Sequence, residues 1–211
     1  MLQVKCMPLG PLETNCYIVH DEEEAIIIDP GGEADKVIAF LADERITPRA
    51  ILLTHAHFDH IGGVDELRTY FNIDVYIHEH EAHWLGDPQL NGSMYFTPDN
   101  IIVKPAEFLL TPGFDSIGPF YFEIVHTPGH SPGSVSFIFH EHSFIISGDV
   151  LFNRGIGRTD LPGGDMAALK RSIRQHIYTL NNLFSVYPGH GPKTTIGDEK
   201  RLNPFIRESI E

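Results

Sequence analysis

This chain of 211 residues has few cysteines and no long apolar run. Its two cysteines, Cys6 and Cys16, are too few for a disulfide framework. No stretch approaches the roughly 18 consecutive apolar residues that a membrane span requires. The first residues, 1–5, also lack the apolar core of a secretory signal. We therefore expect a cytoplasmic protein without a membrane partner.

Basic residues are also scarce, with 15 Lys and Arg against 29 Asp and Glu, and the formal net charge is −14. Non-specific binding to nucleic acid depends on Lys and Arg that neutralise phosphates, so we expect no nucleic-acid partner. A hydrophobic content of 42% is enough for a sizeable core. The length fits one large domain, which we expect to span residues 1–211.

Four side chains that can bind metals lie within six residues, at His55, His57, Asp59 and His60. The apolar run 50–53 before them predicts a buried strand, and the segment 64–71 after them predicts a helix. The cluster then lies on a turn from the carboxyl end of a strand to a helix, where α/β folds place their chemistry. Imidazole and carboxylate are ligands for zinc and similar divalent ions. The motif therefore predicts a metal site.

Three more candidate ligands follow short apolar stretches, each beside glycine or proline: His130, Asp149 and His190. Glycine and proline form the tight turns that hold a side chain at the tip of a strand. Strand tips of one sheet can converge, so the seven residues can line a single cleft. A catalytic zinc needs only three protein ligands and a water. Seven ligands instead suit two ions that share Asp149, separated by roughly 3.5–4 Å.

The order His55-x-His57-x-Asp59-His60, His130, Asp149, His190 resembles the metallo-β-lactamase superfamily. Further segments resemble its glyoxalase II-like (hydroxyacylglutathione hydrolase-like) branch, namely 8–17, 28–32, 148–152, 157–160 and 203–205. The resemblance implies that His55, His57 and His130 hold a first metal. It implies that Asp59, His60 and His190 hold a second, with Asp149 as the bridge. Two divalent ions per chain are expected, zinc first, with iron or manganese as alternatives.

The order of predicted elements indicates an α/β fold, a four-layer αββα sandwich of two mixed β-sheets flanked by helices. Strands are predicted at 3–7, 15–20, 25–29, 50–53, 74–77, 120–125, 135–139, 144–146 and 185–186. Helices are predicted at 34–43, 64–71, 79–85 and 166–177, with a helical turn near 198–202. Segment 86–100 is predicted to be a loop that either borders a cleft or covers the core with its apolar residues.

The resemblance implies a hydrolase that cleaves a small-molecule thioester, in which a metal-bridging hydroxide attacks the carbonyl carbon. Asp59 would be a ligand that also orients this hydroxide. Arg158 is a candidate contact for an anionic substrate group, because a guanidinium recognises carboxylates bidentately. The alternative is that Arg158 forms a structural pair with Asp160. The oligomeric state stays open.

Other functions remain possible on the same motifs. The segment 157–160 also resembles persulfide dioxygenases, which would use one iron at His55, His130 and Asp149. A non-catalytic metal-binding module is a second alternative. A lactamase is a third, less favoured because no secretory segment is seen. We expect the remaining histidines to be solvated or satisfied within the fold, and segment 78–83 to be an exposed helix end.

Overall fold

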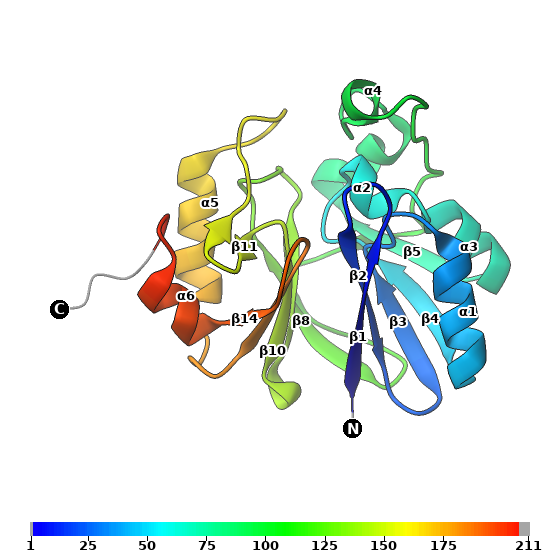
Figure 1. Cartoon of the computed structure of the whole chain (residues 1–211), viewed down its shortest axis with the longest axis horizontal. Coiled ribbons are helices and arrows are strands. Elements are labelled where there is room, and N and C mark those ends of the chain that lie inside the picture. Colours follow the sequence, from blue (N-terminus) through cyan, green and yellow to red (C-terminus); the bar gives the residue numbers. More distant parts are fainter. Residues whose placement is uncertain (1, 207–211) are drawn as a thin grey trace. The chain divides into compact units, whose positions relative to one another are not determined.

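The computed structural model describes residues 2–206. The chain forms two compact units, the first comprising Met1–Thr111 with Ser116–Tyr121 and the second Pro112–Asp115 with Phe122–Glu211. Each unit contains one large β-sheet with its own helices (Figure 1). The prediction of a single domain over residues 1–211 stays a prediction.

The first unit is built on a six-stranded mixed sheet in the order β1-β2-β3-β4-β5-β6. Its strands are β1 (Gln3–Leu9), β2 (Thr14–His20), β3 (Glu24–Ile28), β4 (Thr47–Leu52), β5 (Asp74–His78) and β6 (Phe108–Leu110). Strands β1 to β3 pair antiparallel, and β3 to β6 pair parallel. The parallel strands place their carboxyl ends at one edge of the sheet, where the predicted metal motif follows β4.

Helices cover one face of this sheet because their apolar residues recur every three or four positions. Helix α1 (Ala34–Glu44) buries Val37 and Leu41, and α3 (Val64–Phe71) buries Val64 and Leu67. These side chains pack with strand residues into one hydrophobic core. In Figure 1, α1 and α3 lie beside β3 and β4. The unit also contains the short α2 (Phe58–Ile61), the 3-10 helix η1 (Glu79–Gly86) and α4 (Ser93–Phe96).

The second large sheet is six-stranded and mixed, in the order β14-β13-β10-β9-β8-β7, and it belongs to the second unit except for residues 116–121. Its strands are β7 (Gly113–Ile117), β8 (Phe120–His126), β9 (Val135–Phe139), β10 (Phe144–Gly148), β13 (Ser185–Pro188) and β14 (Thr194–Thr195). A small hairpin of β11 (Leu151–Phe152) and β12 (Gly155–Ile156) follows β10. Strands β10 and β13 pair parallel, so their carboxyl ends lie side by side.

The helix predicted over 166–177 forms in two parts. Helix α5 (Met166–Ser172) begins after Asp165, whose side chain caps it by accepting hydrogen bonds from two backbone amides. The chain then continues as a wider π-helical turn, η3 (Ile173–Ile177). Both parts contribute to the core of the second unit. The apolar spacing predicted a helix but carried no signal for the wider turn. The unit also contains the short 3-10 turn η2 (His140–His142) and ends with α6 (Ile196–Leu202).

The fold class predicted from the sequence is confirmed, because two mixed sheets are each flanked by helices. The expectation missed the short strands β6, β7, β11, β12 and β14, which are too brief or too exposed to show a period. It also missed α4, a single turn within the predicted loop 86–100. No helix between residues 2 and 206 is long and apolar enough to cross a membrane.

A buried carboxylate ties the last helix to the second sheet. Glu199 is fully buried and accepts hydrogen bonds from the Thr194 hydroxyl at 2.6 Å and from the Asn203 amide at 2.9 Å. It also accepts the backbone amide of Arg154 at 2.9 Å, which fixes the β11–β12 hairpin. A buried charge is tolerated only when such donors satisfy it.

Replacement of Thr194 by valine keeps the shape but removes one donor to Glu199. We expect T194V to lower the free energy of unfolding by roughly 1.5–3 kcal/mol, as for a hydrogen bond to a charged group. Chemical denaturation measures this change. T179V is the matched control, because the Thr179 hydroxyl donates to the His176 carbonyl on the surface, and its effect should stay within about 0.5 kcal/mol. Equal effects of the two substitutions would contradict the role given to Glu199.

Candidate metal centre

The first half of the candidate site is built at the carboxyl ends of β3 and β4. These strands are parallel neighbours, with Ile28 opposite Leu52, so the residues that follow them lie together. Asp29 accepts the Thr54 backbone amide at 2.8 Å and the Thr54 hydroxyl at 2.5 Å. The Asp29 side chain is almost fully buried. The carboxylate therefore fixes the start of the turn that carries the candidate ligands.

The turn from β4 to α2 brings three imidazoles together. The ring centroids of His55 and His57 are 4.8 Å apart, and those of His55 and His60 are 4.1 Å apart. Asp59 lies beside them, with its Oδ2 atom 3.6 Å from His60 Nε2. The same Oδ2 accepts a hydrogen bond from the Thr14 hydroxyl at 2.8 Å. The four residues predicted from the motif thus converge within the first unit.

Hydrogen bonds select the tautomers of two of these histidines. The Thr54 hydroxyl gives its only proton to Asp29, so it accepts from His55 Nδ1, at 3.1 Å. His60 Nδ1 donates to Asp29 Oδ2 at 2.9 Å. In both rings the proton on Nδ1 leaves the lone pair on Nε2, the form in which a histidine binds a metal. Asp29, Thr54 and their bonds act as an outer support for the site.

The turn that carries the candidate ligands packs closely against the segment after β3 because residue 31 is a glycine. A Cβ atom at Gly31 would lie 1.8 Å from the backbone oxygen of Asp59, closer than any side chain can approach. Gly31 belongs to segment 28–32, which resembles the glyoxalase II-like branch. Its glycine is explained by this close approach of two backbones.

The segment after β5 corrects one expectation. Residues 78–83 were predicted to be an exposed helix end, and His80 is indeed exposed. However, His78 is buried, and Glu81 is fully buried within η1. Glu81 Oε2 accepts the backbone amide of Ala56 at 2.6 Å. The prediction for Glu81 was wrong because burial of a polar side chain leaves no periodic signal.

The second half of the candidate site is built at the carboxyl ends of β10 and β13. These strands are parallel, with Gly148 opposite Pro188, so Asp149 and His190 lie at the same edge. The Gly189 amide donates to the Gly148 carbonyl at 2.8 Å, which holds the two tips together. Asp149 Oδ2 is 3.6 Å from His190 Nε2.

His130 lies in the loop after β8 and approaches the same carboxylate oxygen. Its Nε2 atom is 3.6 Å from Asp149 Oδ2, as far as that of His190. Its Nδ1 atom donates to the Arg158 carbonyl at 2.8 Å, which again leaves the lone pair on Nε2. One carboxylate oxygen therefore lies equally far from two imidazole nitrogens.

These distances fit divalent ions. Two donors bound at about 2.1 Å to one tetrahedral ion lie roughly 3.4 Å apart. The separations of 3.6 Å between Asp59 and His60, His130 and Asp149, and His190 and Asp149 are close to that value. All donors are imidazole nitrogens or carboxylate oxygens, the set that zinc and similar ions bind. The donor cluster of each unit therefore has the chemistry of a metal-binding site.

Arg158 forms a bidentate pair with Asp160. Its Nε and Nη2 atoms lie 2.7 and 2.8 Å from the two carboxylate oxygens of Asp160. The guanidinium holds the pKa of Asp160 at about 2, so the pair stays ionised at neutral pH. Both side chains are exposed. The Arg158–Asp160 pair is the structural role that was the alternative to a substrate contact. The backbone carbonyl of Arg158 separately orients His130.

The segment 86–100 is attached to the metal-binding turn. The Phe58 amide donates to the Asn91 carbonyl at 2.9 Å, and the Phe58 and Phe96 rings stack with centroids 5.8 Å apart. Met94, Tyr95 and Phe96 are each more than half exposed. Phe96 nevertheless packs on Phe58, which is buried, so the two roles predicted for this segment both stay predictions.

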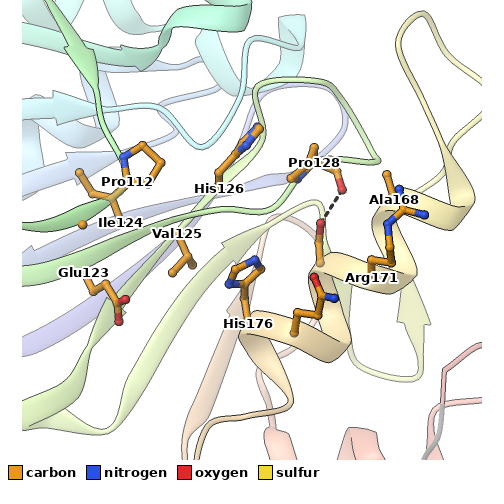
Figure 2. Close-up of a pocket in the computed structure, with 12 residues that line it drawn as sticks. Pro112, Glu123, Ile124, Val125, His126, Pro128, Ala168, Arg171 and His176 are labelled. Atoms are coloured by element: carbon orange, nitrogen blue, oxygen red, sulfur yellow. Dashed lines mark hydrogen bonds between the residues drawn. The ribbon is translucent and has the colours of Figure 1, made fainter.

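A separate cavity of about 510 Å³ lies in the second unit. Strand β8 forms one side, through residues such as Glu123 and His126, and α5 with η3 forms the other, through Arg171 and His176 (Figure 2). The Ser172 hydroxyl donates to the Pro128 carbonyl at 2.7 Å across its end. None of the seven predicted ligands lines this cavity, so it is distinct from the candidate metal centre.

A family model named "Metallo-beta-lactamase superfamily" matches residues 9–190, a range that includes all seven predicted ligands. The chain belongs to the metallo-β-lactamase superfamily. This confirms the resemblance on which the sequence analysis relied. The superfamily contains metallo-hydrolases, and the chain carries its histidine and aspartate clusters.

Relatives match over nearly the whole chain. A Bacillus subtilis (strain 168) protein named "Probable metallo-hydrolase YqgX" is 47% identical, covering 95% of each chain. "Hydroxyacylglutathione hydrolase GloC" of Haemophilus influenzae is 38% identical, covering 97% of this chain and 98% of its own. The glyoxalase II-like branch is thus supported.

Solved structures agree with the fold. "BLEG-1 B3 metallo-beta-lactamase" has a TM-score of 0.94 at 53% identity, covering 97% of this chain and 99% of its own. "TTHA1623 in a di-iron-bound form" has a TM-score of 0.83 at 39% identity, covering 96% of this chain and 100% of its own.

Sequence reasoning identified the candidate ligands but missed the residues that support them. Asp29, Thr14 and Glu81 each hold the 54–60 turn through a hydrogen bond. A usable signal existed for Asp29, a carboxylate directly after a strand that is parallel to β4. Thr14 lies in segment 8–17, but the family resemblance of that segment gave the residue no role, and Glu81 lies outside the resembling segments. Only the fold brings these two residues to the turn.

Gly157 offers a test of how the second half is packed. A Cβ atom there would lie 1.9 Å from the Asp149 backbone oxygen and 3.1 Å from His130 Cβ. We expect G157A to displace both ligands and lower the free energy of unfolding by about 1–3 kcal/mol, as overpacking does. G155A is the control, because its Cβ would meet Phe152 at an ordinary 3.5 Å. Chemical denaturation and metal titration of both variants measure the effect, and equal behaviour of the pair would refute it.

Proposed function

We propose that this protein is a dinuclear metal-dependent hydrolase that cleaves the thioester of a small thiol. The single observation that carries the proposal is the Asp149 oxygen, 3.6 Å from both His130 Nε2 and His190 Nε2. A carboxylate that lies equally near two imidazoles can bridge two ions, with one imidazole bound to each ion. The 38% identity to a protein named hydroxyacylglutathione hydrolase supports the reaction class.

The proposed ligand set follows the superfamily order. His55, His57 and His130 would bind the first ion; Asp59, His60 and His190 would bind the second; Asp149 would bridge them. The tautomers of His55, His60 and His130 support this assignment, since each has its Nδ1 engaged. Zinc is the metal proposed first. Iron is the alternative, supported by the relative solved in a di-iron form.

Bound divalent cations lower the pKa of a water molecule and polarise a carbonyl oxygen, which is the chemistry that thioester hydrolysis needs. Asp59 is proposed to orient the attacking water. Its Oδ2 atom is held by Thr14, so the carboxylate cannot rotate freely. A thiolate leaves readily and needs no strong general acid. This agrees with a ligand-rich site in which no Ser or Cys nucleophile is invoked.

The proposal includes a small-molecule substrate and neither a nucleic-acid nor a membrane partner. The net charge of −14 supports the first exclusion, because it disfavours phosphate backbones. We also propose a cytoplasmic location.

The test combines elemental analysis with a thioester panel. We expect about two ions per chain in the wild type, and expect D149A to lose most of both because its carboxylate is shared. H57A should lower the rate of thioester hydrolysis by more than about 100-fold. This exceeds the 10- to 100-fold effect that is usual when a residue that only orients a ligand is removed. H142A is the control, because His142 is an exposed histidine outside the ligand set, and it should behave as wild type.

A second candidate function is β-lactam hydrolysis. It is favoured by the 53% identity to a structure titled as a B3 metallo-β-lactamase. A chromogenic cephalosporin in the same panel separates the two. Faster turnover of the cephalosporin than of every thioester would overturn the thioesterase proposal. One iron per chain with oxygen uptake on a persulfide would instead identify a dioxygenase.

Arg158 remains a proposed contact for an anionic substrate group. If it binds substrate, R158A should raise KM for an anionic thioester about tenfold or more while leaving kcat within about twofold, because uniform binding is lost. R174A is the control, as an exposed arginine on η3. An unchanged KM in R158A would leave the Asp160 pair as the whole role of the side chain.

A further inference from the structure

Glu81 is a buried carboxylate that no motif explains. It belongs to η1 and is fully buried, although it carries an ionisable group. Placing a carboxylate in the interior is unfavourable unless hydrogen bonds or nearby positive charge offset the loss of water. Its position therefore requires a reason, and its hydrogen bond indicates one.

The bond reaches the centre of the metal-binding turn. Glu81 Oε2 accepts the backbone amide of Ala56 at 2.6 Å. Ala56 lies between two predicted ligands, and its methyl group packs into the hydrophobic core of the first unit. The rings of His55 and His57 lie 4.8 Å apart. The hydrogen bond from the Ala56 amide fixes the backbone between His55 and His57, and therefore the direction of both side chains.

Glu81 itself is held firmly. Trp84, one turn further along η1, is almost fully buried, and its ring lies 6.0 Å from that of His57. Leu85 is fully buried, and its carbonyl accepts the Val103 amide at 2.8 Å. Helix η1 therefore cannot shift without disrupting the core. Through its hydrogen bond to the Ala56 amide, Glu81 restrains the turn that carries the candidate ligands.

We propose that Glu81 is a positioning residue of the metal centre, which holds the Ala56 amide so that His55 and His57 bind the same ion. This inference rests on the proposed role of those two histidines as ligands. Outer groups that orient ligands change metal affinity by about 10- to 100-fold when they are removed.

The experiment measures zinc affinity by competition with a chromophoric chelator in wild type, E81A and E81Q. We expect E81A to weaken binding of the first ion by about 10- to 100-fold. E81Q retains an acceptor oxygen of similar reach and should restore affinity to within about threefold of wild type. With cobalt in place of zinc, E81A should also alter the visible absorption bands, which report coordination geometry.

E79A and E79Q are matched controls on the same helix, because Glu79 is exposed, and both should bind zinc as the wild type does. If E81A folds and binds zinc with wild-type affinity, Glu81 is only structural and the inference fails. If E81A does not fold, E81Q decides, since weakened zinc binding in folded E81Q would contradict an acceptor role. Wild type that binds no zinc, iron or manganese would instead overturn the proposed function itself.

Discussion

The hydrogen bonds of Asp29 are the interaction on which the first half of the site depends. One buried carboxylate receives the Thr54 amide, the Thr54 hydroxyl and His60 Nδ1. It joins the tips of two parallel strands and sets the tautomer of a ligand. A carboxylate so buried is stable only when its donors are in place, so the turn and the anion stabilise each other. Metal-binding geometry is therefore a consequence of how β3 and β4 pair.

The second unit uses a different support for the same purpose. There, parallel pairing of β10 and β13 places Asp149 beside His190, and a backbone carbonyl orients His130. A backbone carbonyl accepts a hydrogen bond without burying a charge. The first unit instead uses the buried carboxylates of Asp29 and Glu81 as acceptors. In both units the candidate ligands follow the ends of strands, and hydrogen-bond acceptors outside the ligand set hold them in place.

The sequence predicted the sheets, the long helices and the candidate ligands because each leaves a local signal. Apolar runs marked β3, β4, β8 and β10, and Gly or Pro marked the turns at the ends of β3, β8 and β10. The same reasoning failed for Glu81, which it placed on an exposed helix end. It also failed for β6 and β14, each of three residues or fewer, whose pairing depends on a neighbouring strand. What the sequence could not predict was long-range: which distant polar groups meet the turn.

The choice of aspartate at position 149 illustrates how closely side-chain length and strand geometry are matched. The residue follows Gly148 in the left-handed region, φ +50°, so the chain turns sharply at the strand end. A short carboxylate there reaches a point 3.6 Å from two imidazole nitrogens that come from different loops. A glutamate would carry its oxygens one methylene further and pass that point, and an asparagine would present an uncharged oxygen. A short anion can lie equally near both imidazoles, and in the proposed dinuclear site it would also offset the charge of two cations.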